Sequence, residues 1–238
     1  MPDAFYEEWY DVPEDDPRHG WRILGARYKA AHIARMVTTP GDRICDVGGG
    51  GGAVASLLHR THGFPEIDVF EVSSSAVAYA RKQPGVKSAT TYDGLSVEVP
   101  DLSYDLAIAS HVVEHVDNPR HFLAELRRIA HTVFIEVPID HQRRINAKAL
   151  AAFGHIHVFT PSIIRFYLEQ SGFEPISESG FCMQRRYDMI AYNRFRNQSL
   201  PDTFANRARL IADVGMGELK RRLWPPAERW SEWCIYAR

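Results

Sequence analysis

The sequence is poor in cysteine. Its 238 residues include three, Cys45, Cys182 and Cys234, which lie far apart and form no CxxC pair. An odd and scattered set excludes a disulfide framework and offers no thiolate zinc site. We therefore expect three ordinary thiols.

The sequence also lacks long apolar stretches and targeting signals. No apolar run approaches the ~20 residues that a helix needs to cross a bilayer. The first residues, MPDAFYEEWYD, have neither the basic start and apolar stretch of a signal peptide nor the arginines of a transit peptide. We expect a cytoplasmic chain with no membrane partner.

Net charge is small as well. A formal charge of −2 gives no general attraction to nucleic acid. Acidic residues gather in 1–19 and basic residues in 182–230, and we interpret both segments as solvated faces; an alternative is that the basic segment meets an anionic substrate. The arginines are dispersed and no RNA-binding module is recognisable, so a nucleic-acid partner is not expected, although an enzyme that modifies RNA by means of the basic segment stays an alternative.

What the sequence has is an alternation of apolar strands and amphipathic helices. Periodicity, N-cap residues and Gly or Pro stops define these segments. The expected strands are 43–47, 67–72, 88–92, 104–110, 132–137, 174–180 and 232–237, and the expected helices are 20–39, 53–62, 76–82, one opened by Asn118-Pro119, and one over 161–170. This order predicts an α/β fold with a doubly wound, mostly parallel seven-stranded sheet.

The length suits a single domain over residues 1–238. We divide it into an N-terminal arm and helix (1–39), a ligand-binding core (40–181), a helical insertion (182–230) and a last strand (231–238). The insertion is too long for a plain connection, and we interpret it as a lid over the ligand crevice.

A glycine run, 48–52, joins the first expected strand to the next helix. Doubly wound sheets bind ligands beyond the carboxyl ends of their strands, and glycine lets the backbone approach a ligand that a Cβ would push away. Gly48, Gly50 and Gly52 therefore predict a binding site.

Two ligands fit this turn. Gly48-x-Gly50-x-x-Ala53, with Glu71 about twenty residues on, matches the dinucleotide fingerprint and makes an NAD-dependent oxidoreductase the alternative. Asp46, two residues before the first glycine, favours another ligand. Its carboxylate would repel a pyrophosphate but suits a ligand that carries an ammonium and a sulfonium.

The chain resembles the class I S-adenosylmethionine-dependent methyltransferases of the type 11-like family. The likeness covers about residues 40–180 and consists of several blocks in the family's order. These blocks are DVGGGGG from Asp46 to Gly52, Glu71, Asp93-Gly94, YDLAIASHVVEHV at 104–116, and HIHVFTP at 155–161. It implies a Rossmann-like methyltransferase fold with S-adenosylmethionine as cofactor. Asp46, the three glycines, Glu71, Asp93 and Ser110 are the residues expected to bind it.

Other residues are candidates for the same ligand. Arg27 is expected to pair with its carboxylate. The aromatic side chains of Tyr6, Trp9 and Tyr10 either fold over the sulfonium or pack as an N-terminal arm.

Histidines gather after the fourth and fifth strands, at the predicted carboxyl edge of the sheet. Methyl transfer to a hydroxyl needs alignment and a base, and histidine suits that role near neutral pH. We expect His111, His115 or His155 to act as base or metal ligand, with His141 and His157 nearby. The prediction is O-methylation of a small polar acceptor, a sugar or a phenol-like hydroxyl.

The string HVVEH at 111–115 also matches a zinc protease motif, H-x-x-E-H, but it directly follows a methyltransferase-like strand. A metal is implied more directly by resemblance to ubiquinone-pathway O-methyltransferases and small-RNA 2′-O-methyltransferases, where Glu-x-x-Glu-His holds a divalent cation. His111 replaces the first Glu, while Glu114 and His115 match. These three residues are the expected ligands of Mg²⁺ or another divalent metal; alternatively, Glu114 braces the loop.

Further alternatives stay open. The chain could be a catalytically silent partner subunit that keeps the cofactor pocket, and it could form a homo-oligomer. The main prediction is an enzyme whose partner is a small-molecule acceptor.

Overall fold

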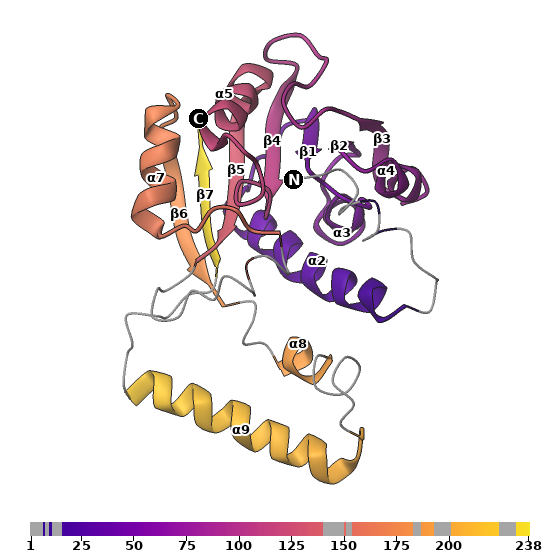
Figure 1. Cartoon of the computed structure of the whole chain (residues 1–238), viewed down its shortest axis with the longest axis vertical. Helices are drawn as coiled ribbons and strands as arrows, with labels where there is room; N and C mark the ends of the chain where they lie inside the picture. The colour runs from indigo at the N-terminus through magenta and orange to yellow at the C-terminus, as the bar shows by residue number, and fades with distance from the viewer. Residues whose placement is uncertain are drawn as a thin grey trace.

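A computed structural model describes residues 7, 10, 16–139, 150, 154–182, 187–192, 201–223 and 232–238. These residues form one α/β body, from which the two helices of the predicted insertion extend (Figure 1).

The body is built on a seven-stranded sheet of order β3-β2-β1-β4-β5-β7-β6. Strands β1 to β5 are parallel, and β7 runs antiparallel to both β5 and β6. The strands are β1 (Ile44–Val47), β2 (Ile67–Glu71), β3 (Val86–Thr91), β4 (Tyr104–Ser110), β5 (Ala130–Pro138), β6 (Pro175–Phe181) and β7 (Glu232–Ala237). The predicted fold class is confirmed.

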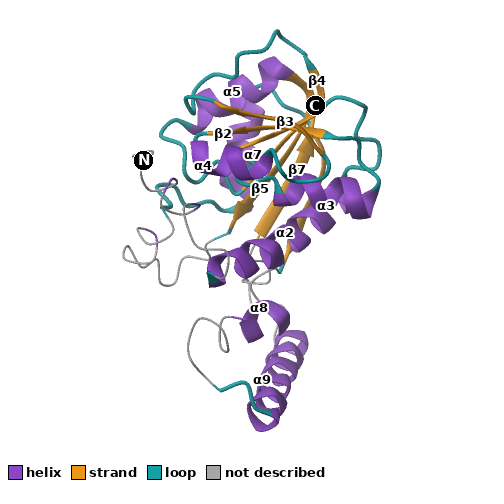
Figure 2. Cartoon of the chain, turned by 90° about the vertical axis from the view of Figure 1, so that its right-hand side faces the viewer, coloured by secondary structure: helices purple, strands orange, loops and turns teal. Residues whose placement is uncertain are grey.

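Helices cover both faces of the sheet (Figure 2). One apolar cluster joins the sheet to α2 (Pro17–Met36), α3 (Ala53–His62) and α4 (Ser74–Ala80). The other joins it to α5 (Pro119–Ile129) and α7 (Pro161–Gln170). The central strands are buried on both faces, which explains their nearly continuous apolar sequences.

Local capping signals set the helix starts. The side chains of Ser73, Asn118 and Thr160 each accept a hydrogen bond from a backbone N–H in the first turn of α4, α5 and α7. In α5 and α7 a proline follows the cap, where its missing N–H costs no hydrogen bond. The starts of α5 and α7 agree with the sequence prediction, whereas α4 covers Ser74–Ala80 instead of the expected 76–82.

The first helix differs from its expected bounds of 20–39. It begins at Pro17, because Asp16 caps it by accepting from the backbone of Arg18, and it tolerates Gly20 within its first turns. It ends at Met36, and Val37 is already extended. Two β-branched threonines then precede Pro40, a context that disfavours helix.

The predicted insertion contains α8 (Tyr187–Tyr192) and α9 (Phe204–Leu223). α8 packs on α2: the Tyr28 hydroxyl donates to Asp188, and the rings of Trp21 and Tyr192 lie 6.0 Å apart. α9 contacts α8 and lies farther from the sheet (Figure 1). None of the described helices is long and apolar enough to span a bilayer.

Replacing Phe134 by Ala should lower the free energy of unfolding by about 3–5 kcal/mol, because its side chain is fully buried in β5 and a cavity would remain. Phe166→Ala is the matched control, since that ring is 58% exposed on α7. Urea unfolding measures both. Equal effects would contradict the assignment of Phe134 to the core.

Candidate functional site

The turn after β1 requires glycine at two positions. Gly48 has φ +76°, and a Cβ there would lie 2.6 Å from Cγ2 of Val112. Gly50 has φ +54°, and a Cβ there would collide with the Tyr10 hydroxyl. Both positions combine a left-handed backbone with close neighbours, so the turn is shaped for glycine alone.

Asp46 is a buried acid in β1, directly before this turn. It is buried at the end of β1, and its Oδ2 has no hydrogen-bond partner among the described residues. Burial and the nearby charge of Glu71 raise the pKa of Asp46 from 3.8 to about 7, although Lys29 opposes the shift. A buried carboxyl group without a partner is costly, and a cationic ligand would relieve that cost.

Glu71 is buried at the end of β2 and braces the loops on both sides. Its Oε2 accepts from the Gly50 N–H at 2.9 Å, and its Oε1 accepts from the N–H groups of Val72 at 2.9 Å and Ser73 at 3.2 Å. Burial raises the pKa of Glu71, while these three hydrogen bonds oppose the shift.

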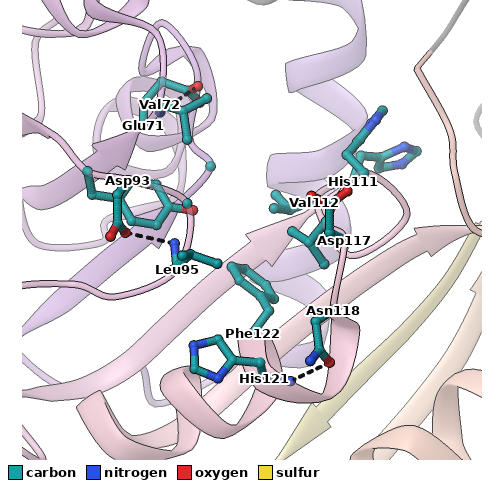
Figure 3. Close-up of a pocket in the computed structure, with 15 residues that line it drawn as sticks. Glu71, Val72, Asp93, Leu95, His111, Val112, Asp117, Asn118, His121 and Phe122 are labelled. Carbon is teal, nitrogen blue, oxygen red and sulfur yellow. Dashed lines mark hydrogen bonds between the residues drawn. The ribbon is translucent and has the colours of Figure 1, made fainter. Parts of the chain in front are cut away.

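A cavity of about 180 Å³ opens beside these acids. Figure 3 shows Glu71, Val72 and Asp93 on one side of it and His111 and Val112 on the other. The lining residues are Gly48, Glu71, Val72, Tyr92, Asp93, Gly94, Leu95, His111, Val112, His115, Val116, Asp117, Asn118, His121 and Phe122.

Asp93 shapes the loop that follows β3. Its carboxylate accepts from the backbone N–H groups of Leu95 and Ser96, both at 2.8 Å, and these bonds lower its pKa. The bonds hold the partly exposed Leu95 side chain at the cavity (Figure 3).

The N-terminal arm reaches the same region. The Glu7 carboxylate accepts from the N–H groups of Ser74 and Ser75 at the start of α4. Burial and the charge of Glu71 raise the pKa of Tyr10 to about 12, and the Arg22 guanidinium lies 4.5 Å from its ring centre. Tyr6 and Trp9 lie outside the described residues.

His111, the first residue after β4, has a strained backbone. Its φ is +58°, which is rare for a residue with a side chain and is typical of functional sites. Its N–H donates to the Glu136 carbonyl at 2.8 Å. Its ring lines the cavity, and burial lowers its pKa well below the usual range. Within the described part of the chain, Nε2 has no hydrogen-bond partner.

A second group lies around Glu114. The Nδ1 of His111 and the Nε2 of His115 are 3.5 Å and 3.7 Å from its Oε1, too far for good hydrogen bonds. Burial raises the pKa of Glu114 to about 8. His115 Nδ1 donates to the Gly154 carbonyl at 3.0 Å, and its ring centre is 4.9 Å from that of His155.

The donor atoms of Glu114, His115 and His155 lie within 4.8 Å of one another. Neither Glu114 oxygen has a hydrogen-bond partner among the described residues. A carboxylate and two imidazoles are ligands that divalent transition metals accept, so this group fits a metal ion. It includes His155 where the sequence prediction had His111, whose Nδ1 still lies beside the same carboxylate.

Under His111 lies a buried polar network centred on Glu136 in β5. His32 of α2 donates to its Oε1 at 2.6 Å, and Ser110 donates to its Oε2 at 2.5 Å. Burial alone would raise the pKa of Glu136, but the His32 hydrogen bond, together with the charge of Lys29, brings it to about 2. Lys29 donates to the Ser110 carbonyl at 3.3 Å.

Most of the predicted site residues lie together at the carboxyl edge of the sheet, but not all of them line the cavity. Arg27 is exposed on α2 and does not line the cavity, Ser110 faces Glu136, His155 lies behind His115, and His141 falls outside the described residues. The insertion contributes no lining residue among those described, so its role as a lid stays a prediction. The sequence reading missed Lys29, His32 and Glu136.

Residues 21–178, well over half of the chain, match the family model described as a methyltransferase domain. The chain belongs to this methyltransferase family. It is a class I S-adenosylmethionine-dependent methyltransferase, which decides between the two ligands considered for the glycine turn. No curated relative matches the sequence.

Solved structures share the fold at low identity. The [4+2]-cyclase SpnF is 20% identical with a TM-score of 0.65, covering 94% of this chain and 85% of its own. A phosphoethanolamine N-methyltransferase from Haemonchus contortus, in complex with S-adenosylmethionine, is 14% identical with a TM-score of 0.65, covering 98% and 59%. An S-adenosylmethionine-dependent methyltransferase from Mesorhizobium loti is 19% identical with a TM-score of 0.57, covering 90% and 97%.

The residues at the turn fit this cofactor. The left-handed glycines give the turn a tight shape that no other residue allows, and Oδ2 of the buried Asp46, which has no partner among the described residues, suits a positively charged ligand. Glu71 and Asp93 flank the cavity at the ends of the next two strands, β2 and β3.

Asp46→Asn should stabilise the ligand-free methyltransferase at pH 8 while weakening its affinity for S-adenosylhomocysteine. The folded pKa lies above the unfolded one, so wild-type stability is full below pH 3.8 and falls as pH rises through about 7. The loss is at most about 4 kcal/mol. Urea unfolding between about pH 5 and about pH 8 tests this prediction. If the unfolding free energy changed equally with pH in the two proteins, the prediction would be contradicted.

Proposed function

We propose that this methyltransferase transfers a methyl group to an oxygen atom of a small polar acceptor, a sugar or a phenol-like hydroxyl, with His111 as the general base. The observation that carries the proposal is the His111 ring, which lines the cavity and whose buried Nε2 has no hydrogen-bond partner among the described residues.

S-adenosylmethionine, when bound, supplies a methyl group on a positively charged sulfur. The glycine turn, Asp46 and Glu71 position this cofactor, and Val72 and Leu95 give the cavity apolar sides. Methyl transfer is an in-line displacement, so the remaining tasks are to align the acceptor and to remove its proton.

His111 is suited to the second task. Its lowered pKa keeps the imidazole neutral at physiological pH, so Nε2 has a lone pair ready for a hydroxyl proton. The hydrogen bond from its N–H to the Glu136 carbonyl fixes the strained backbone. Oε1 of Glu114 is 3.5 Å from Nδ1, where this carboxyl group, whose pKa is about 8, would stabilise the imidazolium once it is ionised.

A divalent metal is a second element of the proposal. The Glu114 oxygens, which have no hydrogen-bond partner among the described residues, and the two imidazoles beside them favour this, and His111 lies next to them. A cation at this place would orient an acceptor hydroxyl and lower its pKa. Mg²⁺ prefers oxygen ligands, so the two imidazoles favour a transition metal instead.

His111→Ala should lower turnover about 100- to 10,000-fold, because the acceptor loses its base. Affinity for S-adenosylhomocysteine should stay nearly unchanged. Transfer of a labelled methyl group to a panel of sugars and phenols measures the first quantity, and calorimetry measures the second. His131→Ala, at an exposed position of β5, is the control. An unchanged rate in His111→Ala would remove this residue from the mechanism.

Calorimetric titration of Mn²⁺ into the full chain tests the metal. Wild-type protein should bind one ion, and Glu114→Gln should lower the affinity at least about tenfold, because it removes the ionisable ligand. The exposed Glu98→Gln is the matched control and should bind like wild type. If wild-type protein takes up no Mn²⁺, the metal is rejected and His111 alone remains as base.

A further inference from the structure

Helix α9 presents an apolar face that the described protein does not cover. At about 100° per residue, an arc of about 140° holds only apolar or small residues over most of the helix. Four large side chains on it are strongly exposed: Phe204 (90%), Ile211 (59%), Met216 (53%) and Leu219 (49%). The small exposed residues of the arc are Ala205, Ala208, Ala212 and Gly215.

This arc is separate from the side of α9 that holds the helix on the protein. Leu210 is 1% exposed and Val214 is half-buried, and both lie on the opposite side of the helix. α9 contacts α8, which in turn packs on α2. The outward arc therefore adds nothing to the packing of α9 on the described chain.

The charge of α9 is positive. Its sequence contains five basic residues, Arg207, Arg209, Lys220, Arg221 and Arg222, against two acidic ones, Asp213 and Glu218. Helical spacing places Arg209 beside one edge of the apolar arc and Arg207, which pairs with Asp202, near the other edge. A partner that complements this helix must be apolar in its interior and negative at its boundary.

We infer that α9 binds the surface of an anionic lipid bilayer. An interfacial helix buries its apolar face at the headgroup boundary, while its basic residues contact anionic headgroups. This association requires no membrane-spanning segment, so it agrees with the lack of one among the described helices. It revises the expectation that the chain has no membrane partner.

A second copy of the chain fits this face less well. One side of a 20-residue helix offers roughly 300 Å², far below the ~800 Å² per partner of a standard protein interface. Pairing α9 with its copy would also bring two positively charged helices together.

Flotation of the full chain with lipid vesicles tests the inference. Wild-type protein should bind vesicles of phosphatidylcholine with phosphatidylglycerol and bind weakly to phosphatidylcholine alone, and added salt should weaken the binding. Phe204→Ser combined with Ile211→Ser should lower the partition coefficient at least about tenfold, because both apolar anchors are lost.

The matched control is Phe166→Ser combined with Ile163→Ser, which removes the same residue pair from α7, where the side chains are 58% and 41% exposed. It should bind vesicles like wild type. Both variants should keep the wild-type affinity for S-adenosylhomocysteine, which verifies folding.

Three results would overturn the inference. These are the absence of vesicle binding by the wild type, an equal loss in the control variant, and a concentration-dependent dimer in light scattering that the α9 variant abolishes.

Discussion

The site depends on the buried carboxylate of Glu136. An ion in the protein interior is tolerated only when hydrogen bonds and opposite charge compensate its lost hydration. Here His32 donates from α2, Ser110 donates from β4, and the backbone carbonyl of the same glutamate accepts from His111. These contacts fix how α2 lies on the sheet. They also hold the strained turn that directs the His111 ring to the cavity, and they bring Lys29 of α2 beside the same strand end.

Burial alone does not decide the charge of this site, because its three acids differ in their partners. Glu136 has two side-chain donors, and its pKa falls to about 2. Asp46 and Glu114 are equally buried, but within the described part of the chain Oδ2 of Asp46 and both oxygens of Glu114 have no hydrogen-bond partner, and the pKa values rise to about 7 and about 8. The Glu136 carboxylate is therefore satisfied by hydrogen bonds within the folded chain. The other two carboxyl groups destabilise the ligand-free protein when they ionise, and a bound cation would remove that destabilisation. That contrast separates the structural acid from the two acids that we assign to ligands.

The fold could be predicted because its signals are local. Cap residues such as Asn118 and Thr160 and the glycines after β1 act through their immediate neighbours, so the sequence alone contains them. The network around Glu136 joins residues about a hundred positions apart, and periodicity does not specify such a pairing. A signal was nevertheless present. Lys29 lies on the same helical stripe as Ala26, Ala30 and Ile33, and Glu136 interrupts an apolar strand. Charged residues at buried positions indicate a polar network, and this favours Lys29 over the exposed Arg27 as the cation of the site.

The residues that could select the methyl acceptor are fewer than those that could bind the cofactor. The glycine turn and the acids at the ends of β1 and β2 serve a cofactor that the whole family uses, so they cannot select the acceptor. The candidate groups for the acceptor are the imidazoles around Glu114, which follow β4 and precede α7. Of these, His111 lies on the side of the cavity opposite Glu71 and Asp93 (Figure 3). An acceptor must therefore approach from the His111 side, where the available groups are a neutral base and an uncompensated carboxyl. Such groups favour a hydroxyl that gives up a proton over an acceptor that arrives without one to lose.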